Sequence, residues 1–529
     1  MDFTSLYSHA GPSSTVASPN DALLATATLT LLVLRDAESF QVLQSWRVPS
    51  GCKFTQLSFS QDSHYLVAAC TNDKNPLVHV YSVTLGDKPA AVITPGSEGL
   101  QGVRWWDDNC FGKRWLACWS RHNLRITVWD LETLKQYHIQ SPKRGCEAGW
   151  AIYPTENEYV AVLERHSGKD HIGLYELERM TLIRHFSLET TDAYNLSWSP
   201  CGRYIAIWET SLEYSLYIYA PSSRLLHHHT LESKSDLLGL GIKKVVWHPS
   251  GRFLAIGGFD DKIRILGDAV GWRSVAELDL PGALFGNTMS GLNSASRRIH
   301  TFSEPAQDEQ ALLAGIAAFD ERTHASTSAA ISYLTESTSS RIRKTSGSRS
   351  QSASASNGKD LGVDHLSFSP SGRFLIATSA SPTSNKTLLL LIRFVRSSPA
   401  LPYTSIRPRL CTIIKLRSPV RRLAWRPSTT LDGKESFAIV AGQKNVLIWN
   451  EEVPNEGNGS SEEDVDEQEY DSSKAPSPGL MEVINIPSKN DFTAMDVKWS
   501  ASGSNMVLSG TSAFCLAWPL PVQDSGAAQ

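Results

Sequence analysis

The fold is decided by two stretches of sequence, AYNLSWSPCGRYIAIWETSLEYSLYIY at residues 193–219 and KKVVWHPSGRFLAIGGFDDKIRIL at residues 243–266. Each begins with an apolar strand that ends in a tryptophan, Trp198 or Trp247. A turn of the form Ser/His-Pro-x-Gly-Arg follows, and then come an apolar strand, a polar hairpin and another apolar strand. The two stretches are therefore copies of one template with which the rest of the chain can be compared.

Aromatic residues recur along the chain with nearly the spacing of these two tryptophans. Phe59, Trp105, Tyr153, Trp198 and Trp247 are separated by 46, 48, 45 and 49 residues. Self-similarity at such a period, with about four short strands per unit, is the sequence signature of a β-propeller of the WD type. The structural anchors of the blades, including the Trp-Asp dipeptide of unit three, are Phe59, Trp105, Trp129, Asp130, Trp198, Trp247, Phe368, Trp425 and Trp499.

Counting units in this way gives about nine blade-like repeats. Propellers usually have four to eight blades, so the units form either a single large ring or two unequal rings, or one of the counted units is irregular. The last unit shows only three strands, which would leave an unpaired sheet edge. The stretch FTSLYS at residues 3–8 is placed to supply the missing outer strand. We therefore expect an all-β WD-repeat propeller with disordered insertions.

The regular spacing is interrupted by two polar segments, one Ser-rich and basic, the other acidic. Segments of this composition bury too little apolar surface to offset the entropy lost on ordering. Two apolar runs in the Ser-rich segment, residues 311–319 and 329–334, are either disordered with it or strands of a degenerate unit. The expected organisation is residues 1–282 for units one to six, 283–359 for the largely disordered insert, 360–450 for units seven and eight, 451–479 for the acidic loop, and 480–529 for the last unit and tail.

The composition excludes several classes of partner. The net charge of −4 gives no general attraction to nucleic acid or anionic lipid, so neither a membrane nor direct nucleic-acid binding is expected. The eight cysteines include no C-x-x-C pair, which favours reduced thiols in the cytosol or nucleus. The start of the chain lacks the features of a signal peptide, and the longest apolar run, residues 22–34, is too short to span a bilayer. We expect a soluble intracellular protein.

No motif in the sequence indicates catalysis, a cofactor or a metal. Nucleophile-elbow, phosphate-loop, zinc-protease and kinase signatures do not occur. The run His227-His228-His229 falls in an outer strand, where alternate side chains face opposite sides, so three ligands cannot converge on one ion. Asp260 and Asp261 occupy a hairpin, where an aspartate ordinarily accepts hydrogen bonds from nearby backbone N–H groups. The sequence therefore predicts neither an enzyme nor a metal site.

A propeller without an active site usually works by presenting loops, and the hairpins between second and third strands lie side by side on one rim. The TSLEY turn is more apolar than a bare turn requires, which favours a contact there. The predicted partner-binding residues of units three to six are Arg121, His122, Asn123, Arg165, His166, Leu212, Glu213, Tyr214, Phe259 and Asp260. The basic run at residues 341–344 is expected to be a solvated linker, and the predicted phosphorylation sites are Thr301, Ser346 and Ser477.

Five stretches carry a resemblance to a known family: NLRITVWDL (123–131), LIRHF (182–186), WETSLEY (208–214), GIKKVVWHPSGRFLAIGGFDDKIRIL (241–266) and SPVRRLAW (418–425). Together they resemble the WD-repeat family that in vertebrates is encoded antisense to the p53 gene and in fission yeast has a spindle-pole counterpart. The resemblance runs along nearly the whole chain. It does not include the Ser-rich insert or the acidic loop.

The resemblance implies a non-enzymatic scaffold at the centrosome or spindle pole body, in a fungal member of the family. There it would pair with a coiled-coil anchoring protein, tether microtubule minus ends and so associate with microtubules indirectly. It would also deliver a minus-end-directed kinesin to the pole. An alternative from another class is a nuclear WD-repeat adaptor for RNA or chromatin complexes.

Overall fold

A computed structural model describes the protein over most of the repeat units. The described residues are 2–11, 14–70, 76–84, 86, 88–106, 114–155, 158–231, 241–280, 300–303, 331–333, 362–380, 387–396, 406–427, 433–451, 479–486 and 492–518. Within these ranges the chain forms nine β-sheets and two short 3-10 helices. None of the helices in these ranges has the length and apolar character needed to cross a bilayer.

Each sheet is one blade, and its strands follow chain order from the centre of the ring outward. Blade 1 contains β3 (Thr15–Ala17), β4 (Leu23–Ala27), β5 (Leu31–Asp36) and β6 (Val42–Arg47). Blade 2 contains β7 (Gln56–Phe59), β8 (Tyr65–Cys70), β9 (Leu77–Ser82) and β10 (Ala91–Ile93). Blade 3 contains β11 (Gly102–Trp105), β12 (Trp115–Trp119), β13 (Arg125–Asp130) and β14 (Gln136–Gln140). Blade 4 contains β15 (Trp150–Ile152), β16 (Tyr159–His166), β17 (Lys169–Glu176) and β18 (Thr181–Ser187). Blade 5 contains β19 (Ala193–Trp198), β20 (Ile205–Glu209), β21 (Ser215–Tyr219) and β22 (Leu225–Thr230). Blade 6 contains β23 (Ile242–Trp247), β24 (Phe253–Gly258), β25 (Lys262–Gly267) and β26 (Arg273–Asp279). The 3-10 helices are η2 (Arg121–Asn123) and η4 (Asp268–Val270).

The last three blades carry additions to the four-strand plan. Blade 7 contains β29 (Val363–Phe368), β30 (Phe374–Ala380), β31 (Thr387–Arg396), β32 (Ile406–Leu416) and β27 (His300–Ser303). Blade 8 contains β33 (Arg422–Trp425), β34 (Ser436–Val440), β35 (Asn445–Asn450), β36 (Leu480–Asn485) and β28 (Ile331–Tyr333). Blade 9 contains β37 (Asp496–Trp499), β38 (Met506–Ser509), β39 (Ala513–Trp518), β1 (Asp2–Phe3) and β2 (Tyr7–Ser8).

Two short pieces of the Ser-rich insert are strands. β27 adds to blade 7 in parallel with β32, and β28 adds antiparallel to β36 of blade 8. The apolar run at residues 329–334 thus contributes an outer strand to an existing blade and no unit of its own. The other run, residues 311–319, lies outside the described residues, as does most of the acidic loop.

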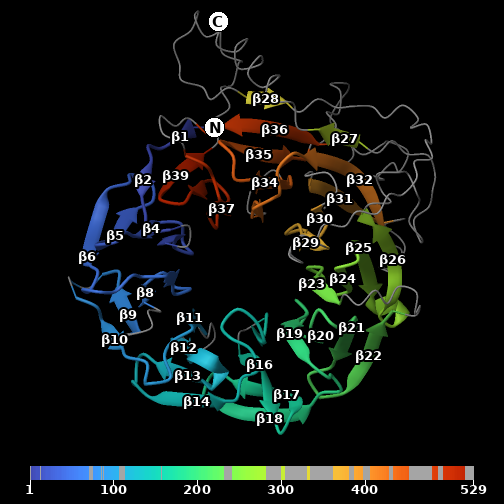
Figure 1. Ribbon diagram of the computed structural model, residues 1–529, viewed down its shortest axis with the longest axis horizontal. Coiled ribbons are helices and arrows are strands. Elements are labelled where there is room, and N and C mark those ends of the chain that lie inside the picture. The colour runs from blue at the N-terminus through green and yellow to red at the C-terminus, as the bar shows by residue number, and fades with distance from the viewer. Residues whose placement is uncertain are drawn as a thin grey trace, which may run out of the picture.

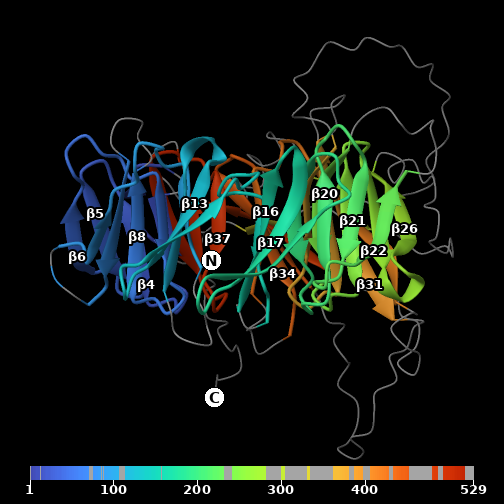
Figure 2. The same ribbon diagram turned by 90° about the horizontal axis from the view of Figure 1, so that it is seen from below.

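The nine blades form a single ring, as Figure 1 shows, and Figure 2 shows their strands running across its thickness. Alternate residues of each strand pack toward opposite neighbours. Leu254 and Ile256 of β24 pack with blade 5, whereas Ala255 of the same strand packs with blade 7. The described residues form nine such apolar clusters, one between each pair of neighbouring blades, including blades 9 and 1. The question left open by the sequence is therefore resolved in favour of one ring.

The recurring tryptophans link neighbouring blades by hydrogen bonds. Each ends the innermost strand of its blade, and its indole N–H donates to the innermost strand of the preceding blade. The Nε1 of Trp198 donates to the Ala151 carbonyl at 3.1 Å, and that of Trp247 donates to the Ser197 carbonyl at 3.3 Å. Trp105 and Trp499 donate in the same way to the backbone carbonyls of Ser58 and Ala424, and Trp425 donates to the hydroxyl of Ser367. Because phenylalanine lacks this donor, the tryptophan at these positions both fills the core and ties two blades together.

The turns after Trp198 and Trp247 require glycine for two reasons. Gly251 has a φ of +68°, a left-handed conformation that L side chains rarely adopt. A Cβ at this position would also lie 2.6 Å from Sγ of Cys201, in the corresponding turn of the preceding blade. Gly202 is in the same situation against Tyr153. The Pro-x-Gly element is therefore part of the contact between blades.

The ring closes where the two ends of the described chain meet in blade 9. β1 and β2 both pair antiparallel with β39, with Phe3 opposite Ala517 and Tyr7 opposite Phe514. The imidazole of His9 contacts the Gly510 carbonyl at 3.1 Å, which extends this seam by a buried hydrogen bond. The sheet edge that a three-stranded last blade would expose is thus paired.

Candidate protein-docking rim

One rim of the propeller is formed by the loops that leave the same end of each blade. Because the strands of a blade are antiparallel and consecutive, its second hairpin and its connection to the next blade lie at that end. We call this surface on blades 3 to 6 the docking rim. It consists of residues 120–124, 141–149, 167–168, 188–192, 210–214 and 259–261.

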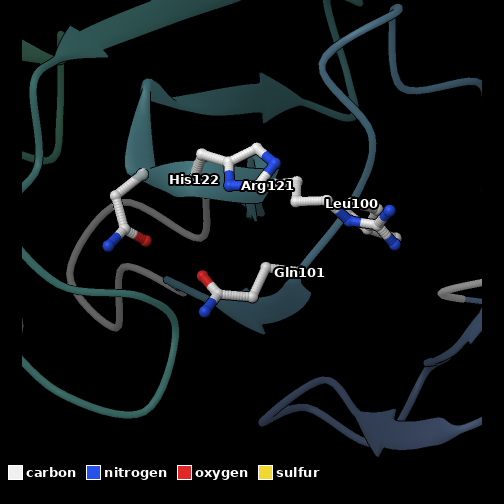
Figure 3. Close-up of a pocket in the computed structure, with 5 residues that line it drawn as sticks. Leu100, Gln101, Arg121 and His122 are labelled. Carbon is white, nitrogen blue, oxygen red and sulfur yellow. The ribbon is translucent and has the colours of Figure 1, made fainter. Parts of the chain in front are cut away.

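The blade 3 part of the docking rim contains η2 and a shallow hollow. Leu100, Gln101, Arg121, His122 and Asn123 line this open hollow of about 470 Å³ (Figure 3). His122 and Asn123 have φ values of 65° and 55°, so η2 presents its side chains from a tight left-handed turn. The open shape and mostly polar lining suit contacts with a protein surface better than enclosure of a cofactor.

The blade 4 part is fixed by a buried ion-pair network. The carboxylate of Asp170 is fully buried and accepts hydrogen bonds from the Lys143 ammonium at 2.7 Å and from the Ala193 backbone N–H at 2.7 Å. Arg165 reaches the same carboxylate at 3.2 Å. Breaking a buried pair costs about 3–5 kcal/mol, so this network holds two inter-blade connections rigidly. Two side chains above this network are accessible to a partner. Arg165 is half-exposed. Tyr194 is exposed, and the Arg144 guanidinium lies over its ring at 5.0 Å.

The TSLEY turn of blade 5 differs in part from the sequence-based expectation. Leu212 is 82% exposed, whereas Tyr214 is only 8% exposed and belongs to the apolar cluster between blades 5 and 6. The Tyr214 hydroxyl accepts a hydrogen bond from Nη1 of Arg264 at 3.0 Å, and the guanidinium lies over the ring at 4.8 Å. Tyr214 is therefore corrected to a core residue, because an arginine of the next blade satisfies its hydroxyl. A substitution there would act on the fold.

Beneath the same turn lies a buried carboxylate. Glu209 is 1% exposed, and its Oε1 accepts hydrogen bonds from the backbone N–H groups of Thr191 and Asp192. Burial raises the pKa of Glu209 to about 7, and the neighbouring Glu213 carboxylate contributes to this increase. Glu213 itself is exposed on the docking rim.

The blade 6 part makes mainly contacts within the protein. The Asp260 carboxylate accepts a charge-assisted hydrogen bond from Arg264 at 2.8 Å. Half-buried Phe259 lies 5.4 Å from the Lys243 ammonium, which in turn pairs with Asp364 of blade 7. Asp261 accepts a hydrogen bond from the Ser379 hydroxyl, also in blade 7. The Lys243–Asp364 pair and the Asp261–Ser379 hydrogen bond hold blades 6 and 7 together. Blades 3 to 5 carry the more exposed side chains.

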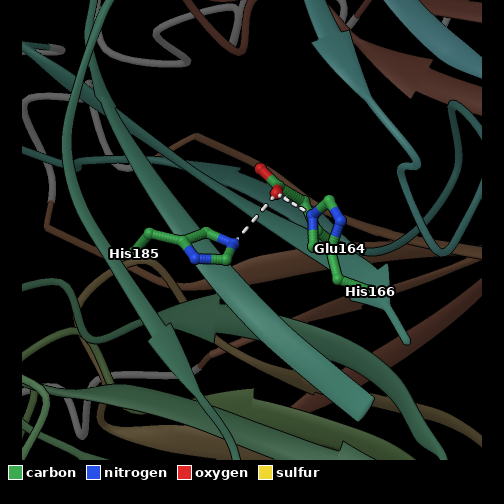
Figure 4. Close-up of side chains that lie close together, drawn as sticks. All are labelled: Glu164, His166 and His185. Atoms are coloured by element: carbon green, nitrogen blue, oxygen red, sulfur yellow. Dashed lines mark hydrogen bonds and ion pairs between the residues drawn. The ribbon is translucent and has the colours of Figure 1, made fainter. Parts of the chain in front are cut away.

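His166 faces a cluster that sequence reasoning missed. Its Nε2 donates to the Glu164 carboxylate at 2.7 Å, and Nε2 of His185 lies 3.2 Å from the same oxygen (Figure 4). The three residues come from β16 and β18, and the sequence signal is weak because His185 is 21 positions from Glu164. The spacing Glu-x-His, which places two side chains on one face of a strand, was the available indication.

The remaining predicted residues lie outside the docking rim. His228 stacks on Tyr217 at 4.1 Å, while His227 and His229 share the opposite face of β22, as strand alternation requires. Thr301 lies in β27, and Ser346 and Ser477 fall outside the described residues. The cysteines that the structure describes are free thiols.

Comparison with known proteins gives relatives along the whole chain. Residues 229–265 match the family "WD domain, G-beta repeat". The mouse protein "WD repeat-containing protein WRAP73" is 26% identical over 502 residues, which cover 94% of this chain and 92% of the mouse protein. An uncharacterized WD repeat-containing protein of Schizosaccharomyces pombe is 28% identical over 148 residues, or 28% of this chain and 30% of that protein. Among solved structures, the C-terminal WD40 domain of Sif2 aligns over 98% of both chains with a TM-score of 0.44 and 9% identity.

Proposed function

We propose that this chain, a WD-repeat β-propeller homologous to mouse WRAP73, is a non-enzymatic scaffold of the spindle pole body or centrosome. The homology confirms the resemblance to the family encoded antisense to the p53 gene. In this proposal the propeller binds a coiled-coil anchoring protein, through which it tethers microtubule minus ends and organises the mitotic spindle. A minus-end-directed kinesin is a further proposed partner.

The observation that carries the proposal is the composition of the docking rim on blades 3 to 5. Leu124 and Leu212 of the docking rim are 53% and 82% exposed. On the strands that border the docking rim, Tyr194 is 43% exposed and the Arg165 side chain is 41% exposed. A coiled coil presents rows of charged side chains beside an apolar seam. An acidic coiled-coil face therefore complements this mixture of guanidinium and apolar groups.

The rigidity of the docking rim supports the same proposal. The Lys143–Asp170 pair fixes the loops in the free protein, so little conformational entropy is lost when a partner binds. Large exposed apolar side chains on fixed loops are the features expected of an interface anchor.

Substitutions at two exposed positions test the proposal. Leu124→Asp together with Leu212→Asp should abolish the mitotic pole foci of a fluorescently tagged chain and its recovery of a coiled-coil pole component, identified by mass spectrometry. Leu134→Asp is the matched control, because Leu134 is 66% exposed but lies in a turn at the opposite rim. Unchanged foci in the double variant, or a wild-type signal spread through the nucleoplasm as a nuclear adaptor would show, would count against the proposal.

A further inference from the structure

The cluster on the face of blade 4 toward blade 3 has the composition of a metal site. Glu164 and His166 of β16 and His185 of β18 each offer one donor atom, and these atoms all lie within 4.8 Å of one another. Figure 4 shows both imidazoles directed at the Glu164 carboxylate. Side chains from the first and third of three adjacent strands would ordinarily be kept apart by the strand between them.

A glycine in the middle strand allows them to meet. Gly173 of β17 lies directly opposite His185 in the register of β17 and β18. A Cβ at Gly173 would lie 2.3 Å from Oε1 of Glu164, closer than any real contact. The missing side chain therefore forms the space in which the Glu164 carboxylate reaches across β17.

A second layer of residues orients the donor atoms. The Tyr175 hydroxyl donates to Oε1 of Glu164 at 2.6 Å, which leaves Oε2 directed at the two imidazoles. His171 stacks on His185 with ring centres 4.8 Å apart and planes 6° apart. Such outer partners fix the orientation of metal-binding side chains.

The charge of the cluster also points to a cation. The Glu164 side chain is 4% exposed, and a buried carboxylate is costly unless a positive group neutralises it. In the part of the chain that the structure describes, the ion-pair partners of Glu164 are His166 and His185, with no lysine or arginine. Arg165, which lies between them in sequence, pairs with Asp170 and Asp192 instead.

We propose that Glu164, His166 and His185 bind a zinc ion. Two imidazoles and one carboxylate suit Zn²⁺, and tetrahedral ligands at its usual bond lengths stand about 3.3 Å apart. His166 and His185 are 38% and 34% exposed, so small rotations of these rings bring the donors to that spacing and the ion enters from solvent. The fourth position is left to water. The site does not depend on the proposed scaffold function.

Metal titration of the full chain tests the site. After treatment with a chelator, wild-type protein should bind one Zn²⁺ by calorimetry and should gain thermal stability from it. His185→Ala should weaken binding by about a hundredfold or more, and Tyr175→Phe by about tenfold. His138→Ala is the control, because His138 is an exposed histidine of β14 outside the cluster and its loss should change neither quantity.

Cobalt substitution separates this site from binding by thiols. Co²⁺ bound to the wild type should give the visible absorption of a tetrahedral nitrogen and oxygen site, without the near-ultraviolet charge-transfer band of a thiolate. The proposal is overturned if the wild type binds no stoichiometric Zn²⁺, if His185→Ala binds it as tightly, or if the thiolate band appears. Circular dichroism of each variant, compared with the wild type, establishes that lost binding is not lost folding.

Discussion

Replacing Glu209 by glutamine should stabilise the propeller above neutral pH and have little effect in acid. Burial and the adjacent Glu213 carboxylate raise the pKa of Glu209 to about 7 in the folded protein. Glutamine is a close replacement, because both backbone N–H groups donate to the single oxygen Oε1, which an amide retains. The amide NH₂ then takes the place of Oε2 and faces Glu213.

The size of the effect follows from the difference between the folded and unfolded pKa values. An unfolded glutamate loses its proton near pH 4.3, whereas folded Glu209 keeps it until about pH 7. Between these values the folded state binds more protons, so its stability falls by about 1.4 kcal/mol per pH unit. The loss is complete above pH 7 and amounts to about 3.7 kcal/mol. The glutamine variant does not titrate here and should avoid this loss.

Thermal unfolding from pH 5 to pH 8 measures this difference. With an unfolding entropy of about 2.1 cal/mol/K per residue, a loss of about 3.7 kcal/mol corresponds to roughly 3 °C in Tm for a chain of this length. The variant should exceed the wild type by about 1 °C at pH 5, and this difference should grow to roughly 3 °C at pH 8. Glu213→Gln should reduce the difference, because it removes the neighbouring charge. A Tm difference that is constant with pH, or that grows toward acid, would refute the reasoning.

Three further changes test the ring itself. Trp247→Ala should lower the free energy of unfolding in urea by about 3–5 kcal/mol, because it empties a buried position and removes an inter-blade hydrogen bond. Trp247→Phe should lower it less, and equal losses would contradict the dual role of Trp247 in packing and in linking blades. Gly251→Ala should lower Tm clearly more than Gly168→Ala, since both have a positive φ but only the first meets a neighbouring blade, and equal shifts would argue against that contact. Deleting residues 2–8 should expose the edge of β39 and increase self-association, as measured by size-exclusion chromatography. A monomeric, protease-resistant product would show that the pairing of β1 and β2 with β39 is dispensable.

The fold is largely predictable because each blade repeats a local pattern. Trp198 and Trp247 recur at the distance that four short strands and their turns occupy, so the anchors can be found without any long-range information. The choice between one ring and two is different in kind. It depends on contacts such as Leu24 with Phe514, which join residues almost 500 positions apart and leave no periodic trace.

The docking rim is predictable only where exposure is set by the local turn. Leu212 protrudes because the hairpin itself places it outside, but Tyr214 is buried because Arg264 of the next blade reaches its hydroxyl. The zinc-binding cluster was missed for a related reason. Glu164 and His185 meet only because the strand between them carries a glycine at the crossing point.

The seam in blade 9 also has a consequence for how the protein is made. Among the strands of the described ring, β1 and β2 are synthesised first, and β39, with which they pair, is synthesised last. During nearly all of its synthesis the nascent chain therefore carries open β edges at both ends of a growing arc. Such edges are templates for misassembly between neighbouring chains on a polysome. We expect closure to be the last step in the folding of the ring, and the nascent arc to require shielding by chaperones until then.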